Sequence, residues 1–184
     1  TSPTLFRSAK EPIGPGSGPA LEARDVVLVL QQVDNRPMDL ELKAIGLAGD
    51  LLELCGSASS GQGKKRATEQ LRSGAAWKKM QQIIRLQGGN EHIAPDDVLH
   101  GAVTYIVKAT KAGKVTDIYN RAIDEGARTL GAPDHKLGGI YLNKKRGATV
   151  KIGEPLFTLY SASADRILLA QHALRDVAIM KVGH

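Results

Sequence analysis

One stretch of the chain reads Gly147-Ala148-Thr149-Val150-Lys151-Ile152-Gly153-Glu154-Pro155-Leu156-Phe157, and it sets the architecture of the C-terminal half. Gly147 and Gly153 flank a short run rich in β-branched residues, and an apolar run follows Pro155. Short strands joined by tight turns have this pattern. The spacing therefore predicts strands at 149–152 and 155–160 that fold back on each other as hairpins.

The same pattern of β-branched runs separated by glycines extends on both sides of this stretch, from about residue 100 to the C-terminus. β-branched residues and glycines predict further strands at 104–109, 114–118, 139–142 and 177–182. Two helices interrupt them: Asn120 is expected to cap a helix that Gly131 terminates, and Ser163 to cap a helix through about residue 174. The half beginning near residue 100 is therefore an α+β unit.

The N-terminal half shows helical spacing instead. Apolar residues recur at intervals of three and four over 19–31 and 37–56, and shorter helices follow at 64–73 and up to Gly88-Gly89. The helix at 37–56 is apolar on so many sides that we expect most of it to be buried. Periodicity breaks between 91 and 101, so we expect a helical part at 1–92 and an α+β domain at 100–184.

The charge of the chain is spread along its length. There are 25 Lys and Arg against 19 Asp and Glu, a net charge of +6. The densest basic runs, Lys64-Lys65-Arg66 and Lys144-Lys145-Arg146, are short and indicate solvated faces. We therefore expect no nucleic-acid partner, although a binding or scaffold module that contacts nucleic acid through residues 144–146 remains the competing class of function.

The cysteine content of the chain indicates a cellular compartment. The single cysteine, Cys55, excludes an internal disulfide framework and fits a reducing, cytoplasmic setting. It lies at the end of the apolar helix, beside Gly56, without an evident base nearby, so we expect it to pack as a small hydrophobic residue. No run approaches 18 apolar residues, so no membrane partner is expected.

A glycine-rich loop precedes the first helix, with glycines at three alternate positions: Gly14, Gly16 and Gly18. Such a loop at a helix N-terminus can bind phosphate, but Pro15 and Pro19 remove two amide donors, which favours a simple tight loop. Its carbonyl oxygens, with a carboxylate from Glu22 or Asp25, could instead hold a hard cation.

Several motifs occur in the order that the thymidine/pyrimidine nucleoside phosphorylase family shows, and the chain resembles that family over essentially its whole length. They are Gly18-Pro19-Ala20-Leu21-Glu22-Ala23-Arg24-Asp25, Leu47-Ala48-Gly49-Asp50-Leu51-Leu52-Glu53-Leu54, Ser73-Gly74-Ala75-Ala76, Gln87-Gly88-Gly89, Gly113-Lys114-Val115-Thr116-Asp117-Ile118, Leu130-Gly131-Ala132 and the glycine-rich hairpin. The Pro-Ala-Leu-Glu-Ala-Arg wording is similar to the branch that contains type 2 thymidine phosphorylases and AMP phosphorylases.

The resemblance implies reversible phosphorolysis of thymidine to thymine and deoxyribose 1-phosphate, with AMP phosphorolysis as the alternative. The family binds phosphate with a Lys-x-Ser-Thr-Gly-Gly-x-Gly-Asp loop, and this sequence holds no such motif. The chain thus resembles the carboxy-terminal portion of the enzyme. We expect no catalytic and no cofactor-binding residue in it, and no turnover by the chain alone.

The resemblance also implies an architecture and an assembly. The first 90 or so residues correspond to helices of the family's large α/β domain, and the rest to an α/β-hammerhead-type domain with a biotinyl-like hairpin. Lys144 and Lys145 lie near a hairpin tip but lack the sequence context of a cofactor-carrying lysine. A cytoplasmic homodimer is expected, whose full-length form binds inorganic phosphate and a nucleoside or nucleotide.

One binding feature of the family is implied for this chain as well. Family members hold a monovalent cation such as potassium with main-chain carbonyls of the loop before the Ala-Leu-Glu helix and with a Glu on that helix. By position, the carbonyls belong to Ile13 and Gly16 and the carboxylate to Asp25. Asp is one methylene shorter than Glu, and further ligands would come from outside this sequence.

Overall fold

The computed structural model of the protein describes residues 11–174 and 177–183. These residues form two compact units. Residues 22–100 make up the helical unit, and residues 11–21, 101–174 and 177–183 make up the sheet unit. Helices combined with antiparallel sheets confirm the predicted α+β class. The hammerhead type, the biotinyl-like hairpin and the domain limits 1–92 and 100–184 stay predictions.

The helical unit follows the predicted helices closely. It contains most of α1 (Pro19–Leu30), then α2 (Met38–Leu54), α3 (Gly63–Arg72), α4 (Ala75–Leu86) and the short 3-10 helix η1 (Pro95–Leu99). Pro19 begins α1, where a missing N–H costs nothing. Gly56, Gly74 and Gly88 follow three of the helices with positive φ, which ends each helix without strain.

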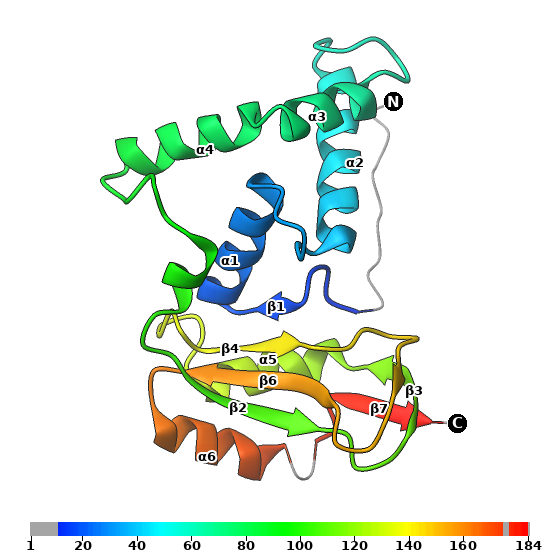
Figure 1. The fold of residues 1–184 in the computed structure, drawn as a ribbon, viewed down its shortest axis with the longest axis vertical. Helices are drawn as coiled ribbons and strands as arrows, with labels where there is room; N and C mark the ends of the chain where they lie inside the picture. The colour runs from blue at the N-terminus through cyan, green and yellow to red at the C-terminus, as the bar shows by residue number, and fades with distance from the viewer. Residues whose placement is uncertain (1–10, 175–176, 184) are drawn as a thin grey trace. The chain divides into compact units, whose positions relative to one another are not determined.

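Two glycines allow α2 and α3 to approach each other closely. A Cβ atom on Gly49 would lie 2.6 Å from the backbone nitrogen of Lys64, and one on Gly63 would lie 2.1 Å from the carbonyl oxygen of Gly49. Any side chain at these positions would separate the two helices. Figure 1 shows α3 crossing the C-terminal end of α2, where this contact lies.

The expectation that α2 is buried on most sides is wrong for this chain. The exposed fraction of Leu42 is 65 % and that of Leu51 is 64 %, and Leu47 and Leu54 are exposed as well. The buried residues of α2 are Glu41, Gly46 and Gly49. The apolar residues encircle the helix, whereas the elements that pack against it here cover only part of its circumference.

The sheet unit is built on two antiparallel sheets. The larger has the strand order β1 (Gly16–Ser17), β4 (Gly139–Leu142), β6 (Pro155–Ser161) and β2 (Val103–Lys108), and the smaller has the order β5 (Thr149–Val150), β3 (Gly113–Ile118) and β7 (Met180–Gly183). In the larger sheet Ile140 pairs with Leu159, and Tyr105 pairs with Leu159 from the other side.

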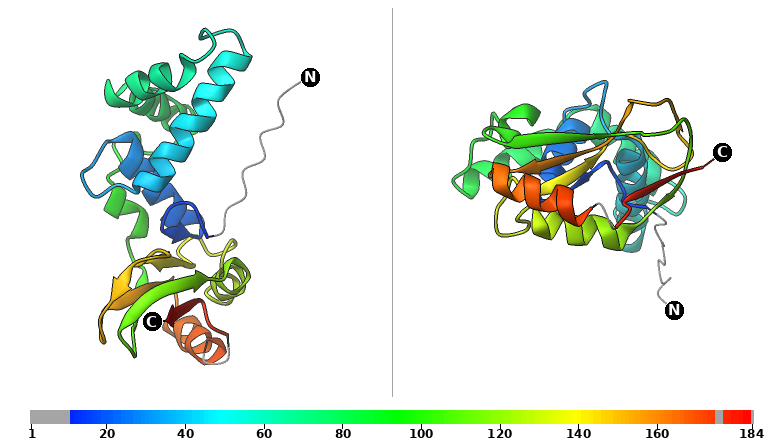
Figure 2. Two further views of the ribbon diagram at one scale, coloured as in Figure 1. Left: turned by 90° about the vertical axis from the view of Figure 1, so that its right-hand side faces the viewer. Right: turned by 90° about the horizontal axis from the view of Figure 1, so that it is seen from below.

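The core of the sheet unit lies between the sheets and two helices, α5 (Asn120–Thr129) and α6 (Ala164–Ala173). α5 packs on β4 and α6 on β6 and β2, and Figure 2 shows both helices on the same side of the larger sheet. The apolar side chains that are 0 % exposed are Leu130, Ile140, Leu159 and Ala170. Ile140 lies on β4 and Leu159 on β6, whereas Leu130 is the C-cap residue of α5 and Ala170 lies in α6, so strands and helices both contribute to the core.

Several boundaries differ from the sequence predictions. The loop at 14–18 contains strand β1, because Gly16 and Ser17 pair with β4 more than 120 residues away. β5 ends at Val150, and β7 begins at Met180 rather than at residue 177. Asn120 is the first residue of α5 and Tyr119 occupies the N-cap position, whereas Ser163 is the N-cap of α6 as predicted.

Candidate functional site

The candidate site is the loop at residues 11–18, which the strand β4 and the turn after it hold in place. The amide of Leu142 donates to the carbonyl oxygen of Pro15 at 2.8 Å. The amide of Arg146 donates to the carboxylate of Glu11 at 2.9 Å. Gly14 takes a φ of +73°, which turns the chain between these two anchors.

An ammonium group binds the main chain of this loop. Nζ of Lys145 donates to the carbonyl oxygen of Pro12 at 2.5 Å and to that of Gly14 at 2.6 Å. Gly14 is buried, and Lys145 is half-buried. Sequence reasoning missed this contact because Lys145 lies more than 130 residues from its partners, and only the pairing of β1 with β4 brings them together.

The residues predicted to bind a cation lie in both units. Ile13 and Gly16 belong to the loop of the sheet unit, where the side chain of Ile13 is exposed and Gly16 is buried opposite Tyr141. Asp25 belongs to the helical unit, on α1, and is 2 % exposed. Glu22, the other carboxylate considered for this role, is exposed. The predicted set of Ile13, Gly16 and Asp25 stays a prediction.

The carbonyl oxygens of Pro12 and Gly14 do not fit a second monovalent cation. Two unit positive charges held about 4 Å apart near a protein surface repel each other by about 4 kcal/mol. A potassium ion bound by the same two oxygens would meet that repulsion from the Lys145 ammonium. Among residues 11–174 and 177–183, no group of three or more His, Cys, Asp and Glu side chains could hold a metal ion.

The other two residues of the basic run 144–146 also bond within the sheet unit. Nζ of Lys144 lies 3.1 Å from the Glu154 carboxylate, and this contact holds the pKa of Glu154 below its usual value. Nε of Arg146 donates to the carbonyl oxygen of Thr116 at 2.8 Å. The run was expected to be a solvated face, but each of its side chains holds the turn onto the sheet unit. By contrast, Lys64, Lys65 and Arg66 are exposed as expected.

A buried carboxylate in the helical unit is fully used by structural contacts. Glu41 is 4 % exposed and accepts hydrogen bonds from Nε of Arg36 and, at 2.9 Å, from Nε2 of Gln32. The Arg36 guanidinium lowers the pKa of Glu41. Both hydrogen-bond donors lie just before α2. The Glu41 carboxylate therefore holds the segment that leads into α2 against the first turn of that helix.

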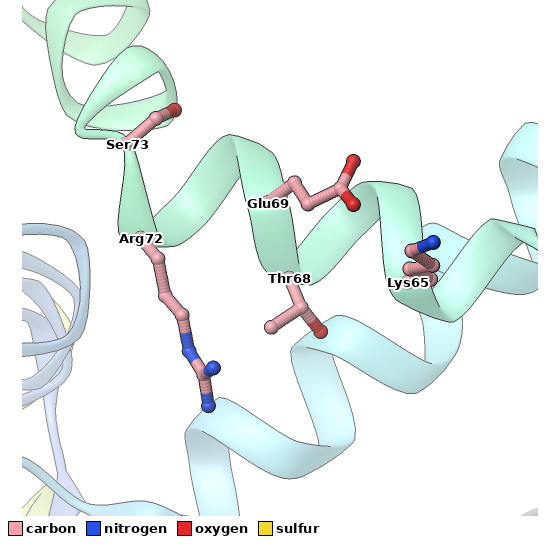
Figure 3. A pocket seen from close by; sticks show the side chains of 5 residues that line it. All are labelled: Lys65, Thr68, Glu69, Arg72 and Ser73. Atoms are coloured by element: carbon pink, nitrogen blue, oxygen red, sulfur yellow. The ribbon is translucent and has the colours of Figure 1, made fainter.

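A polar pocket of about 600 Å³ lies along one helix, α3, and its lining residues are Lys65, Thr68, Glu69, Arg72 and Ser73. Figure 3 shows that the Glu69 carboxylate and the Arg72 guanidinium point away from each other. The five side chains therefore do not converge on one point, as a binding site for phosphate or a nucleoside requires.

Cys55 is exposed, which contradicts its predicted role in packing. It is the C-cap residue of α2, and its Sγ lies 3.2 Å from the Ser57 hydroxyl oxygen. The Ser57 hydroxyl lowers the pKa of the Cys55 thiol. Exposure follows from the position of Cys55 at a helix end, next to the turn that begins at Gly56.

An apolar groove of about 330 Å³ opens between the helices of the helical unit. It is lined by apolar and small side chains of α1, α2, α3 and α4, with one amide among them: Val29, Leu30, Ala44, Ile45, Ala48, Leu51, Leu52, Ala67, Gln70, Leu71 and Ala76. A surface of this kind favours a protein contact over the binding of a charged substrate.

In the part of the chain that the structure describes, no helix has the length and apolarity needed to cross a membrane.

The sequence of this chain is similar to those of known proteins. Residues 114–180 match the family model "Pyrimidine nucleoside phosphorylase C-terminal domain". The chain is 48 % identical over 157 residues to the AMP phosphorylase of Thermococcus kodakarensis, which is 85 % of this chain and 31 % of that protein. It is 46 % identical over 172 residues to the AMP phosphorylase of Pyrococcus horikoshii, covering 94 % of this chain and 34 % of that protein.

A bacterial relative carries a different name. The "Putative thymidine phosphorylase" of Legionella pneumophila (strain Paris) is 43 % identical over 173 residues, 94 % of this chain and 32 % of that protein. The chain thus spans about a third of the length of the curated relatives that it matches. The family model and the relatives indicate the same family that the sequence motifs resemble. The chain therefore belongs to the pyrimidine nucleoside phosphorylase family, of which it carries the C-terminal domain.

Proposed function

We propose that this chain is the C-terminal part of a pentosyltransferase that catalyses the reversible phosphorolysis of thymidine. In this reaction an oxygen of inorganic phosphate forms a bond to C1′ of deoxyribose, the bond from C1′ to the base nitrogen breaks, and the base leaves with the bonding electron pair and takes up a proton. The products are thymine and deoxyribose 1-phosphate. The observation that carries the proposal is similarity to nucleoside phosphorylases over 85 to 94 % of the chain.

AMP is the second candidate substrate. The two AMP phosphorylases named above are 48 % and 46 % identical to the chain, against 43 % for the Legionella protein. With AMP the same bond exchange yields adenine and ribose 1,5-bisphosphate. The compared segment carries no phosphate-loop motif, and so a difference of a few per cent in identity does not weigh strongly between the two substrates.

The role proposed for this chain is support rather than catalysis. Phosphorolysis needs donors that hold phosphate on one face of the sugar and groups that stabilise the leaving base on the other. The buried polar groups described above, Glu41 with Arg36 and Lys145 with its loop, are used in structural contacts. The chain alone is therefore expected to be inactive.

The substrate is tested by assaying the full-length protein that carries this sequence. Purified enzyme is incubated in phosphate buffer with thymidine or with AMP, and the released base is separated and quantified by chromatography. We expect thymine from thymidine and no adenine from AMP. Adenine alone would replace thymidine by AMP as the substrate, and the absence of both bases would overturn the proposed phosphorolysis.

The proposed assembly is a cytoplasmic homodimer, and the exposed leucines of α2 give a test for self-association. Burying apolar surface contributes roughly 25 cal/mol per Å². Leu42 and Leu51 are largely exposed, so the purified chain is expected to elute as a dimer or a larger species at micromolar concentration. Light scattering after size-exclusion chromatography measures the mass. Replacing both residues with lysine should shift the chain towards the monomer, and a wild-type chain that is already monomeric would contradict the expectation.

A further inference from the structure

We infer that two copies of this chain pair through α2, with the two helices antiparallel. The inference rests on the homodimer of the proposed function and adds to it the surface and the orientation. The first observation is a repeat of apolar residues at alternating intervals of four and three along α2. Its members are Leu40, Ala44, Leu47, Leu51 and Leu54, here called the α2 seam. This spacing aligns apolar side chains along the line of contact between two packed helices.

The α2 seam faces away from the helix that packs on α2. α3 lies against Gly49, and residues two apart on a helix differ in direction by about 200°, so Leu51 points to the opposite side. Leu47, Leu51 and Leu54 are accordingly exposed. Ala44 and Leu51 also line the apolar groove described above, so the apolar surface continues beyond the seam. A contiguous exposed apolar surface of this kind favours contact with another protein surface.

The charged residues beside the seam fit a second copy of the same helix. Lys43 and Asp50 are seven residues apart, flank the α2 seam on the same side and are both half-buried. If the helices are antiparallel and Ala44 of one copy lies beside Leu47 of the other, Lys43 of each copy lies beside Asp50 of the other. Both ion pairs form together, because a two-fold axis makes the contact reciprocal. A parallel pair would place Lys43 beside Ala48, without an opposite charge.

The same register also gives the α2 seam matched layers. Leu40 of each copy meets Leu51 of the other, and Ala44 of each copy meets Leu47 of the other. A large side chain therefore faces each small one, which close packing between two helices requires. Charge and volume thus select the same antiparallel arrangement.

Exchange of the two charges tests this pairing. Lys43→Asp places two pairs of negative charges in the dimer, and Asp50→Lys places two pairs of positive charges there. We expect either variant alone to raise the dissociation constant of the dimer about tenfold or more. An equimolar mixture of the two should return it to near the wild-type value, because each copy then presents the charge that the other lacks. Sedimentation equilibrium measures the dissociation constant, and recovery in the mixture also shows that both variants fold.

A matched control makes the same substitution away from α2. Lys111→Asp changes an exposed residue of the sheet unit and should leave the dissociation constant at the wild-type value. Single variants of α2 that dimerise as the wild type does would overturn the inference, and so would a mixture that stays monomeric. A monomeric wild type would remove the self-association itself. None of these outcomes decides phosphorolysis, which the assay of released base measures separately.

The alternative occupant of the α2 seam is polypeptide outside this sequence, because the chain spans about a third of the length of its relatives. Lys43→Asp and Asp50→Lys are therefore also made in the full-length protein, and light scattering follows its mass. We expect each variant to lower the fraction of dimer and the mixture to restore it. A mass that neither substitution changes would assign the seam to that polypeptide and overturn the inference.

Discussion

Replacing Leu159 with alanine is expected to lower the free energy of unfolding of the sheet unit by about 2 to 5 kcal/mol. Leu159 is 0 % exposed in β6 and pairs with Ile140 on one side and Tyr105 on the other. The truncation removes buried methyl groups and leaves a cavity that two neighbouring strands cannot close. Urea denaturation measures the loss.

The aromatic residues of the chain provide a separate spectroscopic probe for each unit. The four tyrosines lie at 105, 119, 141 and 160, all in the sheet unit, whereas the single tryptophan, Trp77, lies in the helical unit. Tyrosine circular dichroism and Trp77 fluorescence therefore follow the two units separately. Leu169→Ala, the same truncation at a residue that is 59 % exposed, should cost about 0.5 kcal/mol or less. Equal losses for the two variants would contradict the core described for this unit.

Replacing Gly18 with alanine is expected to destabilise the sheet unit by about 3 kcal/mol, at the upper end of backbone strain. Gly18 has a φ of +129°, which L-residues rarely adopt, and its Cβ would lie 2.3 Å from the carbonyl oxygen of Gly138. The carbonyl is main chain and cannot move aside without shifting β4. We expect the pairing of β1 with β4 to be lost, which exchange at the Leu142 amide would detect.

Gly153→Ala separates the two causes. Gly153 also has positive φ, +85°, but a Cβ atom there meets nothing within 4 Å. This variant carries the conformational cost without the clash, and so it should lose about 1 kcal/mol. A loss for Gly18→Ala no larger than that for Gly153→Ala would show that the close approach to Gly138 has no energetic weight.

The helices of this chain are predictable from its sequence because local spacing determines them. α1 begins at Pro19 and α3 ends at Arg72, within one residue of the predicted limits, since proline and glycine mark the ends. The environment of the helices is less predictable. The apolar pattern of α2 indicates burial, but the pattern does not reveal which partner covers Leu42 or Leu51.

The candidate site was predicted only in part, for a similar reason. The glycines and prolines at 12–19 predicted a tight loop, and the chain turns there at Gly14, with the short strand β1 within it. Its partner, Lys145, came from a basic run that looked solvated, because the sequence does not show the pairing between β1 and β4. Cys55 was misassigned because its apolar helix ends one residue earlier, at Leu54, so the thiol lies at the exposed C-cap.

The most direct test of the supporting role is an assay of the purified 184-residue chain in phosphate buffer, with thymidine in one series and AMP in another. Release of thymine or adenine is followed against a blank without protein. We predict no base above the blank with either thymidine or AMP, because the Lys-x-Ser-Thr-Gly-Gly-x-Gly-Asp motif expected to bind phosphate does not occur in this sequence. Steady release of either base, in proportion to the amount of chain added, would contradict a purely supporting role.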